Sequence, residues 1–140
     1  MVPRWYWVVA VLALLWMLFG VLAFVMDPLT SDETLAAMSE AERELFLARP
    51  TWLFAIYGAA VFAGLGGAIG LVLRRAWSVH AFLLSLAFVI VQFVFVLFVM
   101  NAIGRIGPAA ALPFPLVIFA IGAGLLWFSF AARSRGWLRG

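Results

Sequence analysis

Residues 77–100 read WSVHAFLLSLAFVIVQFVFVLFVM, an uninterrupted stretch of 24 residues without Asp, Glu, Lys or Arg. A helix of about 20 mainly apolar residues crosses the roughly 30 Å hydrocarbon core of a bilayer. Lipid offers no hydrogen-bond partner to a free backbone, and the stretch lacks the alternating pattern of a barrel strand. It therefore predicts a transmembrane helix.

Three further stretches of the chain have the same character. They cover residues 5–26, 51–73 and 113–132, with 22, 23 and 20 residues, and none contains an acidic or basic side chain. The four stretches make up 89 of the 140 residues. The sequence predicts an all-α membrane protein, a single domain over residues 1–140 built as a bundle of four transmembrane helices.

The composition of the chain also indicates a lipid environment. Hydrophobic residues make up 68% and charged residues 11%, whereas soluble domains are about half apolar and a quarter charged. The chain has no cysteine and one histidine, and all its acids lie outside the apolar stretches on the side away from that histidine. Paired groups for acid–base or nucleophilic catalysis are missing. We expect no catalytic residue, cofactor or metal, and no enzyme.

The arginines divide unevenly between the two ends of the predicted bundle. Because cytoplasmic loops are enriched in positive charge, the richer end is expected to be cytoplasmic, with both termini inside the cell. The opposite end carries the remaining three arginines and all six acids. The six arginines of the richer end are Arg4, Arg74, Arg75, Arg133, Arg135 and Arg139.

The polar connection over residues 27–50 should carry a short helix. Ser39 with Glu42 three positions later fits a capping box, and Pro50 ends the segment. Apolar residues recur on one face between these limits, which predicts a helix over residues 40–48 lying on the outer membrane surface. Two roles stay open for it: a lid or partner-docking element, and a simple cover over the bundle.

The two other connections are expected to be short. Ser78 is a plausible N-cap for the third helix. Residues 101–112 are expected to be irregular because they contain Gly104, Gly107 and Pro108.

Small residues recur along the second apolar stretch at helical spacing. In lipid, such residues let two helix backbones approach closely, and van der Waals packing replaces the absent hydrophobic drive. They predict a helix-packing seam, whose partner is either another helix of the same chain or a second protomer. The seam consists of Ala59, Ala63, Gly66, Gly67 and Gly70.

Gln92 is the most informative polar residue in the chain. It falls well inside the predicted hydrocarbon, where an unpaired amide is costly, so it should face protein or water. One interpretation is a polar contact for a solute passing through the bundle. The other, which we favour, is an interhelical hydrogen bond. Ser78, Ser85 and Gln92 recur every seven residues and should share one stripe of the third helix.

Tyr57 and His80 complete the candidate intramembrane polar contacts. His80 lies near Arg74 and Arg75 and has no second metal ligand beside it. Packing at the membrane interface is therefore favoured over pH sensing or metal binding. Tyr57 could stack its ring on a sugar, although aromatic side chains also fill bundle cores.

Three segments occur in an order that resembles a known family. They are LWMLFG at 15–20, MSEAERELF at 38–46 and GGAIGLVLRRAWSVHAFLLSL at 66–86. The chain resembles a family of uncharacterised bacterial four-helix inner-membrane proteins, some of which carry an automatic sugar transporter label. The resemblance implies a location in the bacterial inner membrane. In that family an acid often follows the glycine of the first helix by three positions, whereas this chain has Ala23 there.

Two functional hypotheses follow. The leading one is a non-enzymatic accessory or structural subunit, with the lipid bilayer and a homo-oligomer or larger membrane complex as its partners. The alternative is a small-solute transporter, with sugars among the candidates, acting as an oligomer around Gln92 and Tyr57. A transporter should have a cavity beside Gln92, whereas a structural subunit should bury it in dry packing. Nucleic acid is not an expected partner, since no basic domain lies outside the membrane.

Overall fold

The computed structural model describes residues 2–139, apart from the side chain of Ala110, and this part of the chain is helical without a β-strand. Its four long helices are each long and apolar enough to cross a membrane. The prediction of an all-helical chain with four candidate spans is thus confirmed. The spans are α1 (Arg4–Met26), α4 (Thr51–Val72), α5 (Trp77–Val94) with its π-helical extension η2 (Phe95–Val99), and α8 (Pro113–Ser134).

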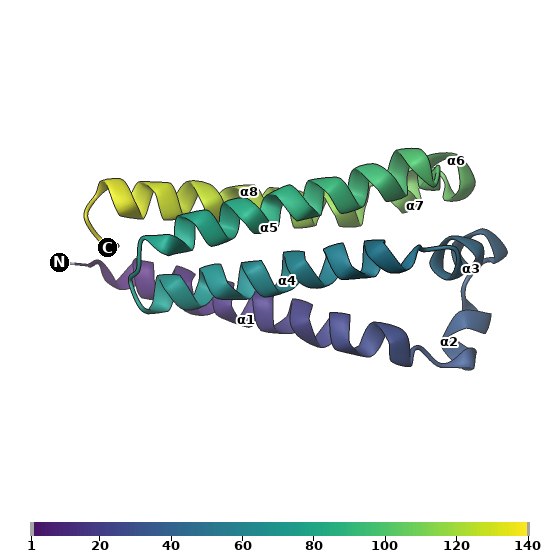
Figure 1. Cartoon of the computed structure of the whole chain (residues 1–140), viewed down its shortest axis with the longest axis horizontal. Helices are drawn as coiled ribbons and strands as arrows, with labels where there is room; N and C mark the ends of the chain where they lie inside the picture. The colour runs from purple at the N-terminus through teal and green to yellow at the C-terminus, as the bar shows by residue number, and fades with distance from the viewer. Residues whose placement is uncertain (1, 140) are drawn as a thin grey trace.

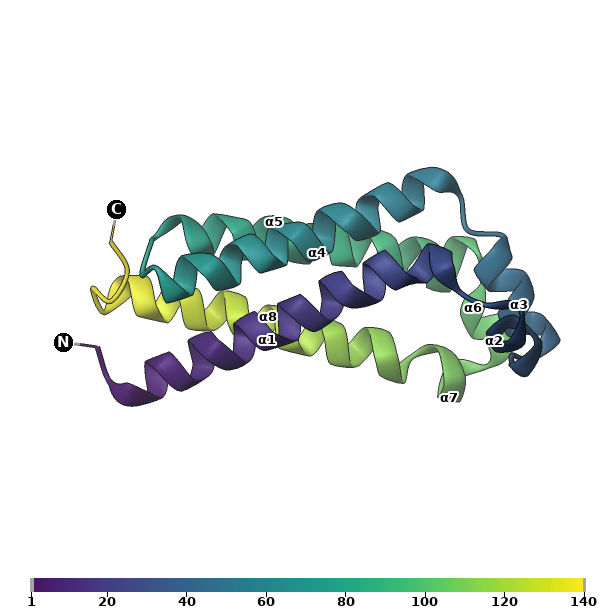
Figure 2. The same cartoon turned by 90° about the horizontal axis from the view of Figure 1, so that it is seen from below.

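The four long helices run along one common axis (Figure 1). α1 packs on α4, α4 on α5, and α5 on α8. Both chain ends lie beside the α4–α5 turn at one end of the bundle, which we call the terminal end. The short helices gather at the other end, the loop end (Figures 1 and 2).

The segment between α1 and α4 contains more helix than the sequence analysis expected. A 3-10 turn, η1 (Asp27–Leu29), is followed by α2 (Asp32–Ala37) and α3 (Glu40–Leu47). The hydroxyls of Ser31 and Ser39 each accept a hydrogen bond of 3.2 Å from a backbone amide, of Thr34 and Glu42 respectively. These bonds satisfy free donors in the first turn, so each serine fixes the start of its helix.

The expectation of an irregular segment over residues 101–112 was wrong. It forms α6 (Ala102–Ile106) and α7 (Pro108–Ala111). Asn101 and Gly107 precede these helices with positive φ angles of 58° and 85°, which interrupt the helical path of the chain. The two short helices bury Ala102 and Ala111 beside Leu97.

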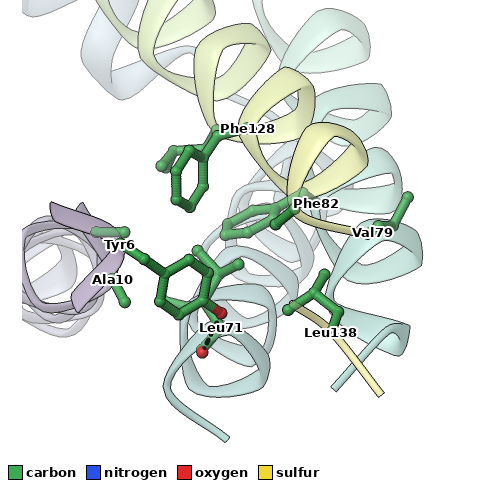
Figure 3. Close-up of a cluster of buried hydrophobic side chains, with 11 residues drawn as sticks. Tyr6, Ala10, Leu71, Val79, Phe82, Phe128 and Leu138 are labelled. Carbon is green, nitrogen blue, oxygen red and sulfur yellow. Dashed lines mark hydrogen bonds between the residues drawn. The ribbon is translucent and has the colours of Figure 1, made fainter. Parts of the chain in front are cut away.

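The terminal end holds the main hydrophobic core. Tyr6, Leu71 and Phe82 are buried there together with Phe128 and Leu138 (Figure 3). The Tyr6 hydroxyl donates a 2.5 Å hydrogen bond to the carbonyl of Leu71. This bond removes an otherwise unpaired hydroxyl from the core and ties α1 to α4.

Ser78 does not cap α5, contrary to prediction. The N-cap residue is Ala76, and the Ser78 side chain points inward against Gly70. The C-terminal tail holds the α4–α5 turn instead: the Arg139 amide donates to the Arg74 carbonyl, and the Ala76 amide donates to the Arg139 carbonyl, both at 2.7 Å. Ser78 is buried, and its hydroxyl has no partner among the described residues.

Candidate functional site

A cavity of about 350 Å³ lies between the four long helices. Pockets for small ligands range from about 300 to 1,000 Å³, so this one is large enough for a single small molecule. Its wall runs over Trp16–Ala23 of α1, Tyr57–Val61 of α4, Phe82–Phe93 of α5 and Phe114–Gly122 of α8. It therefore occupies mainly the half of the bundle nearer the loop end.

The cavity exists because the helices pack closely at the terminal end and diverge beyond it. A Cβ atom on Gly67 would lie 2.7 Å from the Phe82 ring, so glycine brings α4 and α5 together there. Tyr6 stacks on Phe128 and Trp5 meets the same ring edge to face, with ring centroids 5.6 and 5.8 Å apart, which joins α1 to α8 at the same end. Toward the loop end α1 separates from α8 (Figure 1), whereas the rings of Trp52 and Phe95, with centroids 4.6 Å apart, keep α4 in contact with η2.

The small residues of α4 divide between two faces of the helix. Gly67 and Gly70 are buried against α5, and Gly64, which the predicted seam did not include, lies against Met17 and Ser85. By contrast, a Cβ on Gly66 would have nothing within 4 Å. The close contact with α5 thus uses only part of the predicted set. The half-buried members are Ala59, Ala63 and Gly66.

Three of the four candidate polar residues line the cavity, although they come from two helices. Tyr57 projects from α4, and Ser85 and Gln92 project from α5. The Ser85 hydroxyl donates to the Ala60 carbonyl at 2.7 Å, whereas the Gln92 amide has no hydrogen-bond partner among residues 2–139. His80 is exposed near the terminal end and is not part of this lining.

An ion pair that the sequence analysis missed lies at the loop end of the cavity. The Arg49 guanidinium donates to both carboxylate oxygens of Asp27, at 2.6 and 3.1 Å. Its Nε donates to the Phe46 carbonyl at 3.1 Å, and its charge sits 4.1 Å from the centre of the Phe46 ring. The only signal in the sequence was position, since Asp27 directly follows one apolar stretch and Arg49 nearly adjoins the next.

A second pocket of about 260 Å³ adjoins the first under the α3–α4 connection. Both pockets are lined by Asp27, Arg49, Tyr57 and Gln92. These four side chains form what we call the polar junction. Apolar walls extend from the junction into the bundle, so polar groups concentrate at one end of the cavity.

The described residues contain no group of three or more His, Cys, Asp or Glu side chains placed to hold a metal ion. In comparisons with known proteins, no family model, no curated protein and no solved structure matched this chain. The arguments on function below therefore rest on the cavity and its polar junction.

Proposed function

We propose that the protein binds a small amphiphilic solute in the cavity between its four long helices. The observation that carries this proposal is that Tyr57, Ser85 and Gln92, three polar residues of the mainly apolar helices α4 and α5, all line one cavity. This is a narrower form of the solute-transport hypothesis, since a bound solute is the first step of transport. The proposed role is non-enzymatic.

The proposed setting is the inner membrane of a bacterium, with both termini in the cytoplasm. It is supported by the charge distribution, because six of the nine arginines lie at the terminal end and all six acids at the loop end. The resemblance to bacterial inner-membrane proteins points the same way. In this orientation α3 lies on the outer surface, with Leu45 buried against the bundle and its glutamates exposed.

The wall of the cavity favours a solute with an apolar part. Phe19 of α1 and Phe114 of α8 line the cavity and are also 66% and 69% exposed, so they mark an opening between these helices. At that position a membrane places hydrocarbon, which allows entry from the lipid. A free sugar would need many more hydrogen-bonding groups than this wall supplies.

The experiment is to reconstitute the protein in nanodiscs and measure retention of 1-O-dodecylglycerol, a single-chain glycerol ether, by native mass spectrometry. Gly20→Leu places a bulky side chain in the cavity, where the backbone has room for a Cβ 3.8 Å from Val61. Gly124→Leu is the matched control, because Gly124 faces open space outside the lining.

We expect the unmodified protein and Gly124→Leu to retain the ether and Gly20→Leu to lose it. Gln92→Leu should weaken retention by about tenfold, the effect of one lost hydrogen bond of about 1.4 kcal/mol. Equal retention by all four proteins would place the ether on the outer surface and refute the proposal.

An accessory-subunit role is the second candidate, and one observation favours it. The face of α4 that bears Ala59, Ala63 and Gly66 is only half-buried, and Gly66 has no neighbour within 4 Å. A helix of another protein could approach this face closely. Copurification from native membranes tests this role: a stoichiometric partner that is lost in Gly66→Leu supports it, and a chain that purifies alone counts against it.

A further inference from the structure

The shape of the cavity restricts what it can hold. The lining residues of α5 and η2 extend from Phe82 to Val96, which corresponds to a length of about 21 Å at 1.5 Å per helical residue. A volume of about 350 Å³ over such a length makes a narrow space. It suits one extended alkyl chain and is too slender for the two chains of a phospholipid.

The polar junction fixes the direction of such a chain. Its side chains lie at the loop end, whereas the deep end is closed by the Phe82 ring and the terminal core. The second pocket, of about 260 Å³, continues outward from the same four side chains and adds Pro50 and Thr51 to its lining. An alkyl chain therefore fits the first space with its head group in the second.

The charges of the polar junction select the head group. The Arg49 guanidinium donates its hydrogen bonds to Asp27 and to the Phe46 carbonyl. The side chains of Arg49 and Asp27 are only 27% and 17% exposed. An anionic head would compete with Asp27 and a cationic head with Arg49. Either exchange leaves a charge without its partner in a partly desolvated place, which is strongly unfavourable. The Gln92 amide, by contrast, offers both a donor and an acceptor.

We infer that the cavity takes a single-chain amphiphile with an uncharged, hydrogen-bonding head, which lies between Gln92 and the Asp27–Arg49 pair. This inference rests on the proposed function and adds the ligand class to it. A glycerol or sugar head group, with its hydroxyls, meets this requirement for an uncharged hydrogen-bonding head. The charged head of a fatty acid or an alkylammonium does not.

The test compares three probes that share a dodecyl chain: 1-O-dodecylglycerol, dodecanoate and dodecyltrimethylammonium. Each is added to the protein in nanodiscs of uncharged lipid, and the retained probe is counted by native mass spectrometry. We expect the glycerol ether to be retained at least about tenfold more strongly than either ion, a difference of about 1.4 kcal/mol. Equal or stronger retention of an ion would overturn the inference while leaving amphiphile binding intact. If no probe is retained, the proposed function itself fails.

A charge variant locates the head group independently. Asp27→Asn leaves Arg49 without its carboxylate, so the preference should shift toward dodecanoate. The double variant Asp27→Asn with Arg49→Gln restores neutrality and should again prefer the ether. An unchanged preference in the folded Asp27→Asn protein would mean that the head lies elsewhere. If that single variant does not fold, the double variant still decides, because retention of dodecanoate by it would contradict the assignment.

Discussion

At the scale of single residues, two serines on one face of α5 have opposite consequences for stability. Ser78 and Ser85 are both buried, seven residues apart. The Ser85 hydroxyl has the Ala60 carbonyl as its acceptor, while the Ser78 hydroxyl has no partner among the described residues. A buried polar group is stabilising when it is paired and destabilising when it is not. The same side chain thus acts differently according to its neighbour.

The two serines allow a matched prediction. Ser85→Ala should lower the free energy of unfolding by about 1 kcal/mol, because the hydrogen bond to the Ala60 carbonyl is lost. Ser78→Ala should leave stability unchanged or raise it by up to about 1 kcal/mol, because it removes an unpaired hydroxyl. Unfolding in mixed micelles with increasing dodecyl sulfate, followed by circular dichroism, measures both. A Ser78→Ala loss as large as that of Ser85→Ala would show that Ser78 has a partner after all.

At the scale of elements, two adjacent glycines of α4 allow the effect of close packing on stability to be distinguished from the effect of helix propensity. Gly67 faces the Phe82 ring, whereas Gly66 faces open space. The closeness of α4 and α5 therefore depends on Gly67 and not on its neighbour. This difference explains why a run of small residues alone does not reveal which of them form the contact.

Alanine substitution at these glycines should have opposite effects. Gly67→Ala puts a Cβ 2.7 Å from the Phe82 ring, and such overpacking costs about 1 to 3 kcal/mol. Gly66→Ala meets nothing within 4 Å and should gain up to about 1 kcal/mol from helix propensity. The same unfolding assay compares the two variants. Equal effects at the two positions would contradict the packing of α4 on α5 described above.

The helices also show which parts of the fold could be predicted from the sequence and which could not. The long apolar runs predicted all four candidate spans. Uncharged segments of this length must pair their backbone groups within lipid, and a helix does so within a single segment. The helix α2 and the two short helices after α5 were missed, because their starts depend on a serine cap and on left-handed residues such as Asn101. Gln92 was identified as informative, but its surroundings were not, because the space beside it depends on how far separate helices diverge. The Asp27–Arg49 pair likewise depends on the path of the chain between two residues 22 positions apart.

At the scale of the whole molecule, the bundle is closed at one end and hollow toward the other. Aromatic packing around Tyr6 and Phe128 closes the terminal end, and the cavity opens between α1 and α8 nearer the loop end. The side of the membrane that each end faces therefore decides from which leaflet a solute enters. With the termini in the cytoplasm, as proposed, the proposed solute is expected to enter from the outer leaflet.

The orientation can be tested directly because the chain contains no cysteine. Single cysteines at exposed positions, Ser31→Cys at the loop end and Ser134→Cys at the terminal end, give two matched reporters. In intact cells a membrane-impermeant maleimide should label Ser31→Cys and reach Ser134→Cys only after lysis. Labelling in the reverse order would invert the proposed topology and direct the cavity toward the inner leaflet.

The backbone bridge between Arg139 and the α4–α5 turn constrains the order of assembly during synthesis. α4 and α5 have left the ribosome well before the residues that fasten their turn, because Arg139 is made more than sixty positions after Arg74. The α4–α5 hairpin must therefore enter the bilayer before its hydrogen bonds to Arg139 have formed. These bonds can form only after Arg139 has been synthesised, so the nascent protein passes through a stage in which the α4–α5 turn is not yet held by this segment.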